Sequence, residues 1–145
     1  MTELNRPIML VDDDESDIFL EVAALKSGGI DRARLIARDG MEALHILQSI
    51  TAAAHHLPAL ILVDNKMPRM SGLEFLEQVK ADRRLQPIPV VMLSSSRAET
   101  DLVRAYALGV NAYVVKPSDF AAFSEIVEKI GVFWTKCNEP PPAGS

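Results

Sequence analysis

Five short runs of β-branched and aliphatic residues are spaced along the chain, and each precedes a segment long enough for a helix. The runs are residues 8–11, 35–37, 60–63, 90–93 and 113–115. The apolar residues in a run are consecutive rather than alternating, which indicates strands buried on both faces. Strands of this kind form a parallel sheet with helices on both sides. The sequence therefore predicts the α/β fold class.

The segments between these runs have apolar residues at helical spacing. In segments 15–27, 41–50 and 99–108 they recur three and four residues apart. Ser71 and Gly72 begin a further helix, and Ser118 is expected to cap the fifth. Five such units in 145 residues fit one domain. We predict a doubly wound, five-stranded parallel sheet with five helices and the flavodoxin-like strand order 2-1-3-4-5.

Composition excludes several classes of protein. The chain has 15 basic and 20 acidic residues, giving a net charge of −5 without a basic stripe, so we expect no nucleic-acid partner. No apolar run approaches the roughly 18 residues of a membrane span, and the N-terminus lacks the apolar core of a signal peptide. We therefore expect a cytoplasmic protein that does not bind membranes. The single cysteine, Cys137, cannot form an internal disulfide.

Polar residues follow directly after four of the predicted strands. In an open parallel sheet, the carboxyl ends of the strands border the functional crevice. The residues expected there are Asp12, Asp13, Asp14, Asp64, Ser94 and Lys116.

The chemistry of these side chains points to a metal and a phosphoryl group. Carboxylates about 4 Å apart repel each other by roughly 4 kcal/mol at an effective dielectric constant of 20, so such a group favours a cation. Oxygen ligands without His or Cys suit Mg²⁺ or Mn²⁺ better than Zn²⁺. Lys116 and Ser94 add an ammonium and a hydroxyl that can hold phosphoryl oxygens. Asp64 is a carboxylate nucleophile able to form an acyl phosphate.

Each of these residues also has a purely structural interpretation. The acids at 12–14 could simply begin a helix, and we expect Asp14 to be a helix cap rather than a ligand. Lys116 could form an ordinary ion pair in a loop, and the serines that start at Ser94 could mark a turn. None of these interpretations explains why acids and a lysine follow different strands of one sheet, so we favour the metal site.

Four segments at these strand ends resemble the signature regions of the response-regulator receiver domain, the CheY-like family. They read IMLVDDD (8–14), LILVDNKMPRMSG (60–72), VVMLSSS (90–96) and NAYVVKP (111–117). The resemblance extends from about residue 7 to residue 135. We therefore assign residues 1–135 to a receiver domain and residues 136–145 to a proline-containing C-terminal tail, expected to be extended.

The resemblance implies a phospho-acceptor signalling protein of a two-component system rather than an enzyme with a small-molecule substrate. Asp64 would accept a phosphoryl group from a histidine kinase. Asp12, Asp13, Asp64 and the backbone carbonyl of Lys66 would hold Mg²⁺, with Mn²⁺ as a possible substitute.

The same resemblance implies a conformational switch at a protein-binding surface. Ser94 occupies the position of the switch hydroxyl, Lys116 that of the phosphate-binding lysine and Tyr113 that of the switch aromatic. Tyr113 has the alternative interpretation of a half-buried strand residue that does not move. The family also suggests a cis peptide bond between Lys116 and Pro117, which proline permits at modest cost.

The stretch at 105–142 is similar to single-domain regulators that partner phytochrome-type histidine kinases. In that subgroup an aromatic pair precedes a proline-containing tail, and the proteins tend to dimerise. Phe133 and Trp134 are therefore candidates for a homodimer interface. The alternative is that both belong to the apolar stripe, starting at Phe123, that packs the last helix on the sheet.

Two other classes of protein use a similar fold. A haloacid-dehalogenase-type phosphohydrolase requires a second Asp two residues after its nucleophile, and here that residue is Lys66. A flavodoxin-like flavin carrier binds phosphate in its first loop, where the acids at 12–14 would repel it. His45, His55 and His56 are far from the predicted strand ends, so we expect them on the surface.

Overall fold

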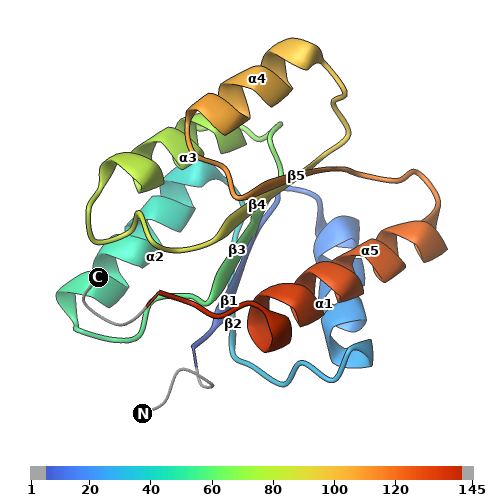
Figure 1. Ribbon diagram of the computed structural model, residues 1–145, viewed down its shortest axis with the longest axis horizontal. Helices are drawn as coiled ribbons and strands as arrows, with labels where there is room; N and C mark the ends of the chain where they lie inside the picture. Colours follow the sequence, from blue (N-terminus) through green and yellow to red (C-terminus); the bar gives the residue numbers. More distant parts are fainter. Residues whose placement is uncertain (1–5, 142–145) are drawn as a thin grey trace.

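The computed structural model describes residues 6–141, which form a five-stranded parallel sheet between two layers of helices (Figure 1). The strands are β1 (Ile8–Val11), β2 (Arg34–Ala37), β3 (Leu60–Val63), β4 (Val90–Ser94) and β5 (Ala112–Val115). The helices are α1 (Glu15–Ser27), α2 (Gly40–Ala52), α3 (Gly72–Ala81), α4 (Glu99–Ala107) and α5 (Phe120–Val132). The strand order β2-β1-β3-β4-β5 confirms the predicted fold class and topology.

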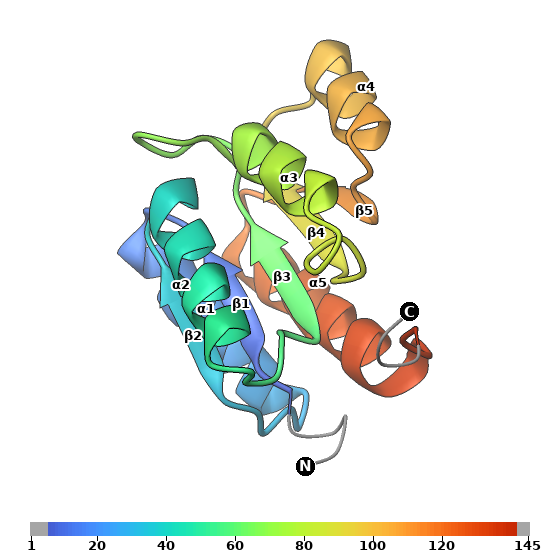
Figure 2. The ribbon, with the colours of Figure 1, turned by 90° about the vertical axis from the view of Figure 1, so that its left-hand side faces the viewer.

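The helices divide between the two faces of the sheet. Figure 1 shows α1 and α5 side by side on one face of the sheet, and α2, α3 and α4 on the other; Figure 2 shows α2 and α3 in front of the strands. Successive residues of a strand therefore enter different cores: Met9 and Val11 pack towards α2 and α3, whereas Ile8 and Leu10 pack towards α1 and α5. This two-sided burial explains why the strand residues are consecutively apolar.

Side-chain caps fix the starts of α1, α2, α3 and α5, whereas α4 has no side-chain cap. Asp14 caps α1 by accepting a hydrogen bond from the backbone N–H of Ser16 at 2.8 Å, which confirms the expected cap. Ser71 caps α3 in a capping box with Glu74. The expectation for Ser118 is wrong, because α5 is capped by Asp119. The Asp119 carboxylate accepts a hydrogen bond at 2.9 Å from the N–H of Ala122, which lies three residues further along the chain.

A π-helical turn, Phe133–Cys137, extends α5 into the segment that the sequence assigns to the tail. It is closed by the N–H of Asn138, which donates to the carbonyl of Phe133 at 2.7 Å. The following described residues form no regular secondary structure, and residues 142–145 of the predicted tail lie outside the described part of the chain. None of the helices within residues 6–141 is long and apolar enough to cross a membrane.

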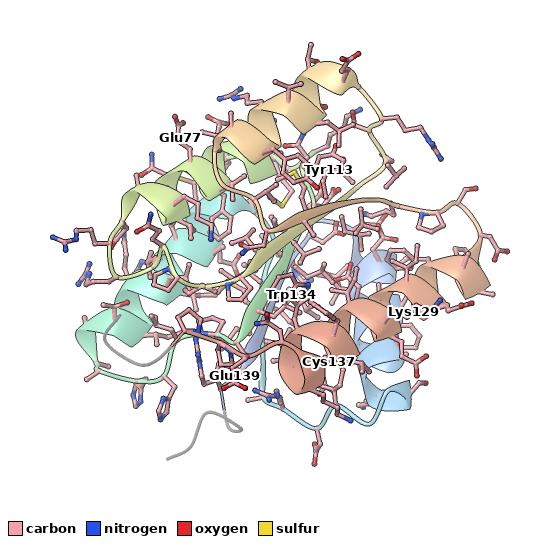
Figure 3. All side chains as sticks on the ribbon, in the orientation of Figure 1. Glu77, Tyr113, Lys129, Trp134, Cys137 and Glu139 are labelled. Atoms are coloured by element: carbon pink, nitrogen blue, oxygen red, sulfur yellow. The ribbon has the colours of Figure 1, made fainter. Side chains whose placement is uncertain are left out.

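The aromatic pair at this turn divides between surface and core. Phe133 is 50% exposed, whereas Trp134 is half-buried and packs against the core between the sheet, α1 and α5. The two rings meet edge to face, with centroids 5.1 Å apart. Figure 3 shows Trp134 and Cys137 near the C-terminal end of α5. Trp134 is therefore partly covered by the core and Phe133 is the more exposed ring, while the interface expected for this pair stays a prediction.

Candidate functional site

Backbone hydrogen bonds beyond the strand ends hold the predicted polar residues at one edge of the sheet. The N–H of Asp12 donates to the carbonyl of Ala37 at 3.1 Å, and the N–H of Asp64 donates to the carbonyl of Val11 at 2.9 Å. The N–H of Lys116 donates to the carbonyl of Ser94 at 2.8 Å. These bonds continue the parallel ladders by one residue, so the positions of the first polar residues are as fixed as those of the strands.

Three carboxylates converge at this edge. One oxygen each from Asp12, Asp13 and Asp64 lie within 4.8 Å of one another. Asp12 is buried, Asp64 is half-buried and Asp13 is exposed, so the group is open to solvent on one side. An oxygen-only set of this kind fits a hard divalent cation such as Mg²⁺ or Mn²⁺, which keeps some of its water ligands.

Without a bound cation, burial and mutual repulsion disfavour the charged form of these carboxylates. Burial raises the pKa of Asp64 to about 6, opposed by the positive charge of Lys116 and reinforced by Asp12 and Asp13. Burial also raises the pKa of Asp12, although the backbone N–H of Asp14 and the charge of Lys116 oppose the shift. A divalent cation bound here would relieve repulsion that the fold itself does not neutralise.

Lys116 reaches the acidic group from β5. Its Nζ lies 3.2 Å from Asp12 Oδ2 and 3.6 Å from Asp64 Oδ1, and its side chain is only 14% exposed. The nearest carboxylate is that of Asp17 on α1, at 2.7 Å. Burial lowers the pKa of Lys116, but the hydrogen bond to Asp17 and the charges of the other acids outweigh burial and raise it. Lys116 is therefore held as an ammonium ion.

Asp17 is a site residue that the sequence analysis missed. The only signal for it is its position in the first turn of α1, three residues after the cap Asp14, where an acid is ordinary in any helix. Its contact with Lys116 depends on how α1 packs against α5 on one face of the sheet, and that packing is not a property of the local sequence.

Ser94 at the end of β4 and Tyr113 on β5 both form hydrogen bonds with Ser96, in the loop after β4. Ser94 is buried at the end of β4, and its Oγ accepts a hydrogen bond from the N–H of Ser96 at 3.2 Å. The hydroxyl of Tyr113 donates to the carbonyl of Ser96 at 3.0 Å. Figure 3 shows Tyr113 on the side of β5 that faces α4. Tyr113 is half-buried in this structure, so a change at Ser94 has a direct route to it through Ser96.

The loop between β3 and α3 carries Lys66, whose side chain is exposed. The loop closes where the N–H of Gly72 donates to the carbonyl of Asn65 at 2.8 Å. A Cβ at position 72 would collide with the backbone oxygen of Asp64, so only glycine permits this approach. Arg69, at φ 64°, ties the other side of the loop to Asp39 through an ion pair.

The expectation of a cis peptide bond before Pro117 is wrong, since residues 6–141 contain none. The trans isomer is the more stable one even before proline, by about 0.5–1 kcal/mol. The expectation for the histidines is confirmed, because His45, His55 and His56 are all exposed.

A parallel sheet of this strand order, with three acids and a lysine at the carboxyl ends of its strands, defines the receiver class of signalling proteins. The family model "Response regulator receiver domain" matches residues 8–128, and the chain belongs to this family. Members of the family are phosphorylated on an aspartate.

The relatives of the chain include other response regulators. Response regulator Rcp1 of Synechocystis is 35% identical over 144 residues, which cover 97% of this chain and 98% of Rcp1. Its Mn²⁺-bound crystal structure has a TM-score of 0.86 at 34% identity, covering 94% and 99% of the two chains.

Two solved structures of phytochrome regulators are also similar to this chain. The phosphorylated cyanobacterial phytochrome response regulator RcpA is 36% identical with a TM-score of 0.88, covering 95% of this chain and 99% of its own. The bacteriophytochrome response regulator AtBRR is 46% identical with a TM-score of 0.71, covering 93% and 99%.

Proposed function

We propose that Asp64 is the phosphoryl acceptor of this response regulator and that a phytochrome-type histidine kinase is the donor. The observation that carries the proposal is the position of Asp64: its carboxylate lies beside those of Asp12 and Asp13 and 3.6 Å from the Lys116 ammonium. The names of the relatives support the choice of kinase, since Rcp1, RcpA and AtBRR span the described fold and RcpA and AtBRR are phytochrome regulators.

The side chains of Asp12, Asp13 and Asp64, with the backbone carbonyl of Lys66, would hold Mg²⁺ in this site. A bound divalent cation would neutralise charge on the phosphoryl oxygens. The crystallised Mn²⁺-bound form of Rcp1 supports this proposal, because it is a relative that binds a divalent ion. The resident ion of this protein is proposed to be Mg²⁺, with Mn²⁺ able to replace it.

The transfer needs one nucleophile and two donors from this chain. A carboxylate oxygen of Asp64 attacks the phosphorus of a phosphohistidine in line with the P–N bond. The new O–P bond forms as the P–N bond breaks, and the electron pair remains on the imidazole nitrogen. Lys116 Nζ and the hydroxyl of Ser94 then donate hydrogen bonds to the phosphoryl oxygens.

The output follows from the loop that Ser94 shares with Tyr113. When the Ser94 hydroxyl turns to a phosphoryl oxygen, its hydrogen bond with the N–H of Ser96 is exchanged, and the loop after β4 shifts. Because Tyr113 is bonded to the carbonyl of Ser96, the shift changes the surface of α4 and β5. We propose that this receiver, residues 1–135 with the tail 136–145, signals in the cytoplasm by changing its protein contacts.

Labelling with acetyl phosphate tests the acceptor chemistry. With Mg²⁺, the protein should incorporate about one phosphoryl group per chain at most, and excess EDTA should abolish the labelling because the acidic group loses its cation. The label should be lost in alkali or hydroxylamine, as an acyl phosphate is. Label that is stable in alkali, or that forms equally in EDTA, contradicts the proposal. Continuous release of phosphate from small phosphate esters would favour a phosphohydrolase.

We also propose a homodimer that uses Phe133. This ring is 50% exposed at the end of α5, whereas Trp134 contributes to the core, so Phe133 is the residue to change. Phe133→Ala should halve the particle mass in light scattering at about 10 μM protein, because an exposed aromatic anchor contributes strongly to an interface. Phe120→Ala, at the other end of α5 and 73% exposed, is the matched control. An unchanged mass of the Phe133 variant would reject this anchor.

A further inference from the structure

The closest acid to the site lysine is not the proposed acceptor. Lys116 Nζ donates to Asp17 Oδ2 at 2.7 Å and to Asp12 Oδ2 at 3.2 Å, and it lies 3.6 Å from Asp64 Oδ1. The first two distances are those of hydrogen bonds and the third is not. In the unphosphorylated protein, the shortest hydrogen bond of Lys116 is thus the one to Asp17 of α1.

Asp17 occupies a fixed position. Its N–H donates to the Asp14 carboxylate at 3.1 Å, within the capped first turn of α1. The side chain of Asp17 is 23% exposed and that of Lys116 is 14% exposed, so solvent screens this pair less than a surface ion pair. The ring of Phe123 lies 5.9 Å from Nζ and covers another side of the ammonium.

The contacts with Asp17 and Asp12 use most of the hydrogen-bond donors of the ammonium group. Lys116 has three N–H donors. Asp17 and Asp12 take two of them, which leaves one for an oxygen on the side of Asp64. A phosphoryl group bound to Asp64 would bring its oxygens to that side. The two existing contacts therefore orient the lysine before the phosphoryl group arrives.

A second acid lies on the same face of α1, and it is buried. Glu21 lies one helical turn after Asp17, is 2% exposed and has no hydrogen-bond partner for Oε1. Burial, together with the charges of Asp12, Asp17 and Asp64, raises the pKa of Glu21 well above its usual value, although Lys116 opposes the shift. Burial thus disfavours the charged form of Glu21, whereas Asp17 is the acid of α1 that forms an ion pair with Lys116.

We propose that Asp17 is a positioning residue for phosphoryl transfer, which acts by holding the Lys116 ammonium so that its remaining N–H faces the phosphoryl group on Asp64. This role rests on the proposed acceptor function of Asp64. Without the charge of Asp17, the ammonium is drawn to the remaining carboxylates, Asp12 and Asp64. It then pairs with the carboxylate of Asp64, which is the nucleophile, and no longer holds an N–H group towards the phosphoryl oxygens.

The test measures the initial rate of acetyl phosphate labelling at saturating Mg²⁺ in Asp17→Asn. The amide is similar in size to the carboxylate, but it removes the charge. We expect the rate to fall about tenfold, which is the scale of one charge-assisted hydrogen bond. The matched control is Glu15→Gln, which removes a charge from the same turn of α1, where Glu15 pairs with Arg38 at 2.9 Å and not with Lys116. This control should stay within twofold of the wild type.

A double-mutant cycle separates a positioning role from a merely structural one. If Asp17 acts through Lys116, then Asp17→Asn should cause little further loss in the background of Lys116→Met. Asp17→Glu, which restores the charge, should recover most of the rate. Urea unfolding of each variant shows whether it folds. The proposal is overturned if Asp17→Asn stays within twofold of wild type, or if it slows the Lys116→Met protein as much as it slows the wild type.

The same experiment distinguishes this failure from failure of the acceptor assignment. If wild type is not labelled at all, or if Asp64→Asn is labelled as well as wild type, then the acceptor function fails. If labelling requires Asp64 while Asp17→Asn behaves like Glu15→Gln, then only the role of Asp17 is rejected.

Discussion

Replacement of Asp64 by Asn should reduce acetyl phosphate labelling at least a hundredfold. The amide oxygen carries no negative charge, so it is a much weaker nucleophile than the carboxylate. The substitution also removes one of the three carboxylates that lie within 4.8 Å of one another. Nucleophile and metal ligand are lost together, so we expect no slow residual labelling at higher Mg²⁺ concentration. The measurement is phosphoryl incorporation per chain at equal protein, acetyl phosphate and Mg²⁺.

Asp14→Asn provides the matched control for this experiment. Asp14 belongs to the same acidic run, but its carboxylate caps α1 by accepting from the N–H groups of Ser16 and Asp17. Asparagine is as good a helix cap as aspartate, so the helix should be retained. We expect this variant to be labelled within threefold of wild type. Equal labelling of the Asp64 variant and the wild type would remove Asp64 from the mechanism.

The fold could be predicted because its physical causes are local in the sequence. Each strand is apolar at consecutive positions, and this pattern has few explanations other than burial between two helical layers. The residue after each strand then falls at the same edge of the sheet. Asp12, Asp64 and Lys116 could be placed together on that basis alone, and their observed distances agree with it.

The remaining features of the site depend on how separate elements pack. Asp17 contacts Lys116 because α1 packs beside α5 on one face of the sheet, and Tyr113 bonds to Ser96 because the loop after β4 brings that carbonyl to its hydroxyl. Neither contact leaves a pattern in the sequence. The helical stripe that ends in Phe133 and Trp134 shows the same limit: its periodicity is that of a core face, yet the packing covers Trp134 and exposes Phe133.

The metal-free Asp64→Asn variant should unfold less readily than wild type at pH 8. Burial raises the pKa of Asp64 from its ordinary value of 3.8 to about 6, so the folded wild-type protein must keep an unfavourable carboxylate charged above that pH. A shift of this size corresponds to about 3 kcal/mol in the free energy of unfolding. Asparagine has nearly the same shape without the charge. We therefore expect a gain of up to about 3 kcal/mol in urea unfolding with EDTA.

The dependence of this gain on pH identifies its cause. Between about pH 4 and pH 6 the folded wild type binds more protons at Asp64 than the unfolded chain does, so its stability falls as pH rises through this window. Below about pH 4 both states hold the proton, and the variant should lose its advantage. The single tryptophan, Trp134, reports unfolding in both proteins. Asp31→Asn, at an exposed position between α1 and β2, controls for removal of a negative charge in general.

Mg²⁺ should reverse the order of stability that these two proteins show in EDTA. In the wild type, a cation bound by Asp12, Asp13 and Asp64 stabilises the folded state in proportion to the logarithm of its concentration. The variant keeps only two of these carboxylates and should gain less. Titration of Mg²⁺ at pH 8 should therefore close the gap and then favour the wild type. A gap that persists unchanged at all Mg²⁺ concentrations would show that the ion does not bind at Asp64.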